Sequence, residues 1–297
     1  MRGWWQDFTD LVLPAECGGC GRPRTVLCPE CRAVLSGASA RRVRPVPEPP
    51  GLPMVYAAAR YADEARATLL AHKERGALAL AAPLGVALAR AVRAGLHRAG
   101  HEQVGSRGAG APVLLVPVPS ARRAVRARGH DPARRIALAA AGELRRSGTP
   151  ARVLGVLRQR RAVADQAELN SRQRLENLAG ALTVAPGGAR LLTEGPVVLV
   201  DDVLTTGASL AEAARAVRAA LATGPVSNAV EIAAVYEGET WESREEQNVG
   251  ARREGTAGRP GRRVITGTGG AGGVADVVCA AVVAASPDSD SSGINWN

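Results

Sequence analysis

Two adjacent acidic residues stand at the end of an apolar run in this chain. Residues 197–210 read VVLVDDVLTTGASL, so the run leads straight into Asp201 and Asp202. The turn that follows contains Thr205, Thr206, Gly207 and Ser209 and opens an alanine-rich helical pattern. Hydroxyls, consecutive backbone N–H groups and a helix dipole together bind phosphate, and a glycine lets the backbone approach it closely. Carboxylates beside such a site repel a second anion but accept hydrogen bonds from vicinal hydroxyls, so the stretch predicts a ligand shaped like ribose 5-phosphate.

Three other kinds of site that place a turn after a strand do not fit this sequence. A response-regulator receiver also uses paired acids, but it needs a lysine downstream, and the only lysine of the chain, Lys73, lies upstream. A nucleotide P-loop needs G-x-x-x-x-G-K-[ST], but no lysine follows a suitable glycine. A dinucleotide fold needs G-x-G-x-x-G directly after a strand, which none of the apolar runs predicted as strands provides. The structural alternative that remains is a strand-end turn with solvated carboxylates.

Four cysteines form a second group with a chemical pattern. Cys17, Cys20, Cys28 and Cys31 give C-x2-C-x7-C-x2-C within CGGCGRPRTVLCPEC. Short loops rich in Gly and Pro let four thiolates converge on one Zn²⁺, and since all four ligands come from the protein, the zinc is predicted to be structural. Two disulfides are the alternative, which a reducing cytosol disfavours. Cys279 lies apart in an apolar run and is expected to be a small buried residue.

The elements that must position these residues alternate between apolar runs and helical patterns. Strands are predicted at 54–61, 113–119 and 197–203, and helices at 64–74, 78–98, 132–146 and 209–221. Short, wholly apolar strands followed by helices indicate a parallel sheet covered on both faces. In such sheets ligands bind beyond the carboxyl ends of the strands, which is where Asp201 and Asp202 would lie.

Composition limits the class of protein. At 297 residues, of which 46% are hydrophobic, the chain can bury one core and carry a small accessory module. The formal charge of +10 would suit an anionic partner such as nucleic acid, but nearly all basic residues are arginines in an Ala- and Gly-rich chain, which indicates compositional bias. We find no run of 18 or more apolar residues and no export signal near the start, so we expect a cytoplasmic protein that is not transmembrane.

Taken together, the motifs resemble those of a known family. VVLVDDVLTTGAS looks like the phosphoribosyl-pyrophosphate (PRPP) motif of type I phosphoribosyltransferases. The preceding four-cysteine knuckle, LLAHKERG around Lys73, and PVP followed by R-x-R-G-H within 116–130 are similar to the ComF family of competence and GntX-like proteins. So is RAVADQAELNSRQRLEN, through the spacing of Gln166, Arg172 and Asn177. The resemblance covers roughly residues 10–222 and returns at 274–286.

The resemblance implies an α/β, parallel-sheet, type I phosphoribosyltransferase-like domain that binds PRPP with Mg²⁺. Asp201 and Asp202 would be catalytic, because their charge would favour the positive centre that develops on the ribose as pyrophosphate leaves. The residues implied in PRPP binding are Val203, Leu204, Thr205, Thr206, Gly207, Ala208 and Ser209, with Lys73, Arg122, Arg123 and Arg128 as basic groups nearby. For Lys73 an exposed charge at a helix end is an equal alternative. For Gln166, Arg172 and Asn177 a structural role is equally open.

The sequence departs from the family pattern in two places. Where relatives usually show R-G-F-N-Q, residues 128–132 read R-G-H-D-P, so a loop expected near the second substrate differs. Residues 224–273 are rich in charge and glycine and are predicted as a flexible insertion. The expected organisation is a zinc knuckle at 1–35, a proline-rich linker at 36–53, the transferase-like domain at 54–286 and a tail at 287–297.

Three classes of function remain open. The first is an enzyme that transfers phosphoribose from PRPP to an unidentified nucleophile with release of pyrophosphate. The second is a non-catalytic accessory protein of competence and DNA uptake that keeps the site to bind a PRPP-like ligand. The third, a direct binder of single-stranded DNA, is disfavoured because the chain has 1 Phe and 3 Tyr for base stacking. No aromatic clamp identifies an acceptor, and the resemblance is compatible with a homodimer.

Overall fold

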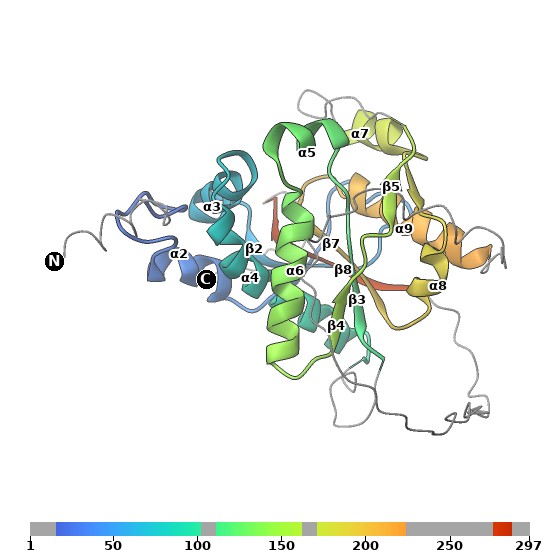
Figure 1. Ribbon diagram of the computed structural model, residues 1–297, viewed down its shortest axis with the longest axis horizontal. Helices are drawn as coiled ribbons and strands as arrows, with labels where there is room; N and C mark the ends of the chain where they lie inside the picture. Colours follow the sequence, from blue (N-terminus) through green and yellow to red (C-terminus); the bar gives the residue numbers. More distant parts are fainter. Residues whose placement is uncertain (1–15, 102–110, 162–170, 224–275, 287–297) are drawn as a thin grey trace, which may run out of the picture. The chain divides into compact units, whose positions relative to one another are not determined.

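The computed structural model describes residues 16–101, 111–161, 171–223 and 276–286. Within them a six-stranded sheet has the order β1-β2-β8-β7-β3-β4 (Figure 1). Its strands are β1 (Arg41–Val43), β2 (Val55–Arg60), β3 (Val113–Pro117), β4 (Ala151–Val153), β7 (Val197–Leu204) and β8 (Val277–Ala285). Neighbouring strands are parallel except for the edge pair β1–β2, which is antiparallel. The prediction of an α/β fold with a mostly parallel sheet is confirmed.

Four predicted helices, at 64–74, 78–98, 132–146 and 209–221, begin and end close to the predicted positions, and four shorter helices were not predicted. The described residues thus contain eight helices. They are α2 (Pro29–Ser36), α3 (Asp63–Glu74), α4 (Ala81–Arg98), α5 (Arg122–Arg128), α6 (Pro132–Arg146), α7 (Ser171–Leu178), α8 (Gly188–Leu192) and α9 (Ala208–Ala222), with a 3-10 turn η1 (Leu78–Leu80) before α4. The start of α6 shows why: the Asp131 carboxylate accepts a hydrogen bond from the Arg134 N–H at 3.2 Å, and Pro132 occupies the first helical position. The single helix predicted at 78–98 is divided into η1 and α4.

The sheet separates two apolar clusters. The first cluster contains Val198 and Val200 of β7 together with side chains of α3, α4 and α6. The second contains Val197 and Leu199 together with side chains of α9 and of a two-stranded sheet, β5 (Leu157–Gln159) and β6 (Leu182–Val184). Successive side chains of a strand point to opposite faces, so β7 contributes alternate residues to the two clusters. This central strand is therefore fixed from both sides, and its end is a rigid place for a site.

The segments before β2 are built into the same core. The predicted linker at 36–53 contains β1, in which Arg42 lies opposite Tyr56 of β2. In the cysteine knuckle, Leu27 and Leu35 belong to the apolar cluster that also holds Leu80 of η1. The sequence pattern predicts neither the pairing of β1 with β2 nor the packing of the knuckle. It indicates local structure only, and not which part of the core a short segment covers.

The predictions that the chain has no membrane span, and that it has an insertion and a tail, are tested only in part by the structure. The stretch Leu78–Arg98 is long and apolar enough to cross a membrane by length and composition, with a hydropathy of 1.4, and 61% of its most apolar part is buried in the protein. A core helix passes the same test, so the absence of a transmembrane span stays a prediction. Cys279 is fully buried, as expected. The predicted insertion at 224–273 and the tail at 287–297 lie outside the described residues.

Candidate functional site

The paired acids lie at the carboxyl end of β7, where parallel α/β sheets bind ligands. One Asp202 oxygen accepts a hydrogen bond from the Val203 N–H at 2.9 Å, and one Asp201 oxygen accepts from the Asp202 N–H at 2.9 Å. Asp202 is 7% exposed, and Asp201 is half-buried. Each carboxylate has further lone pairs, so these local bonds fix the side chains and leave acceptor capacity for a ligand.

Helix α3 brings the lysine of the chain to these acids. Lys73 Nζ donates a hydrogen bond to Asp202 Oδ2 at 2.9 Å, across 129 residues of sequence. Burial disfavours the charged ammonium, but the negative charge of Asp202 and the hydrogen bond to it outweigh burial and raise the pKa of Lys73. Lys73 is therefore a paired cation at the site and not a solitary charge at a helix end.

Asp201, the other acid of the pair, has a different electrostatic environment. Burial, and then the negative charge of Asp202, raise the pKa of Asp201 well above its ordinary value, against the opposing charge of Lys73. One acid of the pair is thus neutralised by a lysine, while its neighbour has no cation of its own among the contacts described. Titratable groups with strongly shifted pKa values gather at functional sites, which makes this pair the strongest candidate in the described part of the chain.

The turn after β7, where a phosphate site was predicted, leads directly into α9. Gly207 has a φ of +75° and caps α9, so the backbone turns sharply from the strand into the helix. Thr206 Oγ1 accepts a 3.5 Å hydrogen bond from the Ala208 N–H, Thr205 is exposed and Ser209 is half-buried. The amino end of α9, with its positive dipole end and hydroxyls, comes immediately after the two carboxylates.

Two residues that sequence reasoning missed lie against this turn. A Cβ at position 207 would be 3.1 Å from a Leu52 methyl carbon and 3.2 Å from the Pro45 ring. The positive φ and this contact with the segment before β2 together require a glycine. The sequence pattern predicts that Gly207 makes room for a phosphate. In the structure, a side chain at position 207 would instead point at Leu52 and Pro45. No local motif could have indicated this, because Pro45 and Leu52 lie more than 150 residues earlier in the sequence.

Helix α3 also holds the loop that departs from the family pattern. The His72 carbonyl oxygen lies 3.1 Å from His130 Nε2, and Glu74 accepts a hydrogen bond from Arg128 Nη1 at 2.9 Å. His72, Lys73 and Glu74 are consecutive, so the last turn of α3 contacts both the loop between α5 and α6 and the end of β7. His130 is 8% exposed, and its Nδ1 faces the Arg128 carbonyl oxygen at 3.1 Å. The histidine of R-G-H-D-P thus anchors this loop to α3.

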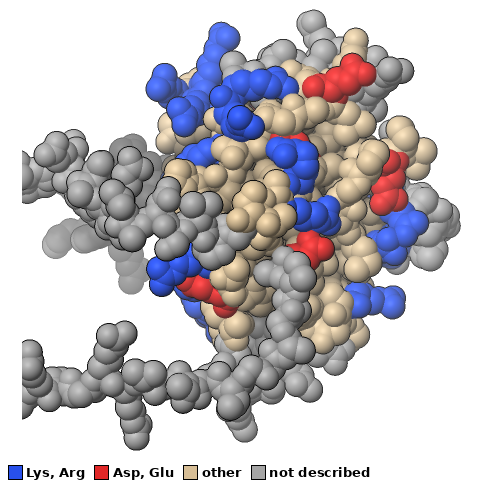
Figure 2. All heavy atoms as spheres, turned by 90° about the vertical axis from the view of Figure 1, so that its right-hand side faces the viewer, with Lys and Arg blue, Asp and Glu red and all other residues tan. Residues whose placement is uncertain are grey.

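The remaining predicted basic residues are only partly brought to the site. Arg128 reaches α3 through Glu74, but Arg122 and Arg123 are exposed on α5, and within the described residues no hydrogen bond or ion pair holds either of them. Figure 2 shows acidic side chains among the basic ones on the side of the molecule to the right in Figure 1. Several basic side chains gather near the top of that face (Figure 2).

The Q…R…N residues give less information. Gln166 lies outside the described residues, and so does the side chain of Arg172. Asn177 lies on α7, which packs against α9, the helix that follows the phosphate-type turn. Its role therefore stays a prediction.

The four cysteines form a compact cluster. Their sulfur atoms all lie within 4.8 Å of one another, and the Cys20 and Cys28 sulfurs are 3.7 Å apart. Four thiolates at 2.3 Å from one zinc ion would lie about 3.8 Å apart, so the group fits a tetrahedral ion. All four thiols are free, so the alternative of two disulfides is not what the structure shows. The cluster could hold a metal ion such as zinc.

The protonation chemistry of the cluster agrees with a bound cation. Burial disfavours the Cys17 thiolate, but hydrogen bonds with the backbone of Cys20 and Cys28 outweigh burial and lower its pKa to about 6. Burial and the neighbouring thiols raise the pKa of Cys31. Four thiolates cannot crowd together without a compensating charge, which a metal ion supplies.

The cysteine cluster is packed directly on α3. A Cβ at Gly19 would lie 2.7 Å from the Cys31 sulfur and 3.2 Å from the Thr68 hydroxyl of α3. A Cβ at Gly18 would lie 2.5 Å from a Leu80 methyl carbon. These close approaches need glycine, and they connect the cluster to the helix that carries Lys73.

These features define an α/β protein with a mostly parallel six-stranded sheet and a four-cysteine cluster near its N-terminus. No protein-family model matches the chain, and no curated protein matches it significantly.

Proposed function

We propose that the chain binds PRPP together with Mg²⁺ and transfers its phosphoribosyl group to a nucleophile, with release of pyrophosphate. The observation that carries the proposal is the order of groups at the end of β7: two carboxylates, then a left-handed glycine, then the amino end of α9. A sugar phosphate needs both kinds of group side by side, because its hydroxyls donate to carboxylates and its phosphate accepts from backbone N–H groups.

The residues present fit the substrate and its ion. The turn at 204–209 would receive the 5-phosphate, because it leads into the amino end of α9 and Thr205 and Ser209 offer hydroxyls. Asp201 and Asp202 offer carboxylate oxygens that can accept hydrogen bonds from ribose hydroxyls and can bind Mg²⁺. Lys73 already lies at Asp202, where it would meet the negative pyrophosphate.

The chain's own groups would act mainly by position and charge. Bond breaking at the ribose leaves a positive centre, which the carboxylates of Asp201 and Asp202 would stabilise, while Lys73 would stabilise the departing anion. When bound, Mg²⁺ would supply further neutralisation of the phosphate oxygens. No protein nucleophile is required.

One observation favours a second candidate, a non-catalytic accessory protein of DNA uptake that keeps the site for ligand binding. Lys73 neutralises Asp202, which lowers the negative charge available to a developing cation. A site of this charge balance would still bind a sugar phosphate. This candidate binds the same ligand and differs from the first in turnover only.

For the cysteine cluster we propose one structural Zn²⁺. The four thiols account for the whole tetrahedral coordination of this ion, so no position is left for a substrate. A reducing compartment such as the cytoplasm would keep these thiols available for metal.

The experiment that separates the two candidates is a screen of nucleobases and amines with PRPP and Mg²⁺, read by pyrophosphate release. An enzyme releases pyrophosphate with at least one acceptor, and Asp202→Asn should reduce turnover more than affinity because the lost charge acts on the transition state. Glu194→Gln removes an acid from an exposed ion pair with Arg152 and serves as the matched control. Binding of PRPP without pyrophosphate release for any acceptor would favour the accessory protein.

A further inference from the structure

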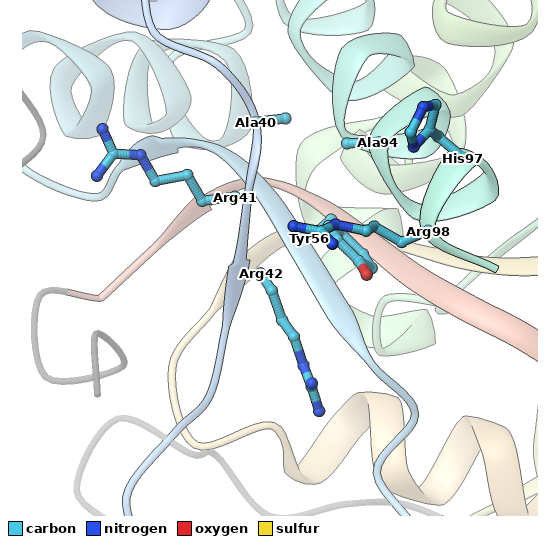
Figure 3. A pocket seen from close by; sticks show the side chains of 7 residues that line it. All are labelled: Ala40, Arg41, Arg42, Tyr56, Ala94, His97 and Arg98. Carbon is cyan, nitrogen blue, oxygen red and sulfur yellow. The ribbon is translucent and has the colours of Figure 1, made fainter. Parts of the chain in front are cut away.

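A second concave site lies between the edge strand β1 and the end of α4. A cavity of about 430 Å³ is lined by Ala40, Arg41, Arg42, Tyr56, Ala94, His97 and Arg98 (Figure 3). None of these residues belongs to the candidate site at the end of β7. Cavities of this size hold small ligands, and the lining combines basic groups with a tyrosine and two alanines.

Tyr56 forms a fixed base for the cavity. It is only 4% exposed, and its ring lies in the apolar cluster under α4. Gly95 permits this close approach, because a Cβ there would lie 3.1 Å from the Tyr56 ring and 2.5 Å from the Cys279 sulfur. Within the described part of the protein no hydrogen bond is made by the Tyr56 hydroxyl, although a buried tyrosine usually has a partner for this group. The hydroxyl is therefore a donor, set in place and available to a ligand.

Two arginines that have no ion pair within the described residues also line the cavity. Arg42 lies opposite Tyr56 in the β1–β2 pair, and Arg98 extends over Tyr56 from the end of α4 (Figure 3). The ends of the Arg41 and Arg42 side chains point away from Tyr56 (Figure 3). Among the described residues neither Arg42 nor Arg98 makes an ion pair, and the lining contains no acidic residue. Burial and the Cys279 thiol raise the pKa of Tyr56, and the charges of Arg42 and Arg98 act in the opposite direction.

We propose that this cavity binds the phosphate group of a small phosphorylated metabolite. Guanidinium groups donate paired hydrogen bonds that match phosphate oxygens, and Arg98 extends over Tyr56 while Arg42 lines the same cavity (Figure 3). Ala40 and Ala94 leave apolar wall for the organic part of the ligand. A nucleic-acid strand fits less well, because the donor at the base is recessed and the cavity has room for about one nucleotide.

The test uses inorganic phosphate and adenosine 5′-monophosphate as probes, titrated into the full chain by calorimetry at low salt. Both probes should bind, and Tyr56→Phe and Arg98→Gln should each weaken binding about tenfold or more, the loss expected for one charge-assisted hydrogen bond. Tyr56→Phe keeps the buried ring and removes a hydroxyl without a protein partner, so the fold should be retained. Arg190→Gln, an exposed arginine on α8, is the matched control and should bind as wild type does.

Amide hydrogen exchange locates the bound probe. Protection is expected over β2 and the last turn of α4, separately from any protection at 204–209 caused by the proposed PRPP site. If the chain does not bind PRPP, the protection of β2 and of the last turn of α4 by the two probes is still expected. The inference is overturned if neither probe binds, if Arg190→Gln weakens binding as much as Arg98→Gln, or if protection is confined to 204–209. A single-stranded oligonucleotide that binds here while both small probes do not would also overturn it.

Discussion

Lys73 Nζ lies 2.9 Å from Asp202 Oδ2 and connects the end of α3 to the end of the central strand β7. The lysine side chain is 37% exposed and that of the aspartate 10%, so the pair is intermediate between surface and buried ion pairs. An aspartate that is buried to this extent depends on its cation. The pair therefore has consequences for stability as well as for the proposed binding site.

Replacing Lys73 by Met should destabilise the protein, because the Asp202 carboxylate would remain buried without its partner. We expect a loss of about 1–3 kcal/mol in the free energy of unfolding, between the values for exposed and buried pairs. The double variant Lys73→Met/Asp202→Asn should recover much of this loss. Urea unfolding measures all three proteins, with Arg152→Gln, which breaks an exposed pair with Glu194, as a control that should cost less. Additive losses in the double variant would show that the two residues do not interact.

The contribution of Asp201 to the stability of the protein should depend on pH. Its pKa is raised in the folded protein, so its contribution to stability is fully present below the ordinary carboxyl pKa of about 4 and is lost as pH rises through the folded value. Asp201→Asn cannot ionise and can still accept the Asp202 N–H, so this variant should be more stable than wild type at pH 8. The difference should disappear near pH 4. Thermal unfolding at both pH values checks this, and a variant that is less stable at pH 8 would contradict it.

Gly207 should tolerate no side chain, for reasons of backbone and packing. Gly207→Val forces a branched residue to a φ of +75° and toward Leu52 and Pro45, and we expect a cost of about 1–3 kcal/mol or more. Gly142→Ala is the matched control, because Gly142 lies inside α6 with nothing within 4 Å of an added Cβ. That change should stabilise by roughly 0.5–1 kcal/mol. Denaturant unfolding of both variants is the measurement, and equal effects would remove the special role of Gly207.

Removing the metal should affect more than the cysteine knuckle. Elemental analysis of reduced protein should give about one zinc per chain. Because Gly19 of the cysteine knuckle lies against Thr68 of α3, Cys17→Ser should lower amide-exchange protection along α3 as well as at the cysteines. Cys279→Ser, at a buried cysteine outside the cluster, should leave the zinc content unchanged. Metal-free wild-type protein, or a Cys17→Ser variant with normal protection of α3, would show that the cluster has no such role.

The sequence predicted what depends on short-range chemistry. The α6 helix follows from an aspartate cap and a proline at its start, and β7 follows from an apolar run that ends at two acids. The four cysteines were predicted as one cluster because their spacing brings the thiols together without any other part of the chain.

The unpredicted features all depend on contacts between distant segments. Lys73 was assigned to the site only through a resemblance, since nothing near it in the sequence indicates Asp202 as its partner. The packing of Leu52 against Gly207 and the pairing of β1 with β2 depend on how the segment at 36–53 folds back, and its prolines indicate only that it is not helical. The burial of His130 also depends on the tertiary fold, because its ring contacts the His72 carbonyl oxygen of α3.

The most direct test of the central claim is calorimetric titration of PRPP with Mg²⁺ into wild type, Ser209→Asp and Thr223→Asp. Ser209→Asp puts a carboxylate at the amino end of α9, where it would repel the 5-phosphate, and Thr223→Asp makes a similar change at the other end of the same helix. Wild type and Thr223→Asp should bind alike, and Ser209→Asp should bind at least about tenfold more weakly. No heat with wild type, or equal affinities for all three proteins, would contradict a PRPP site at this turn.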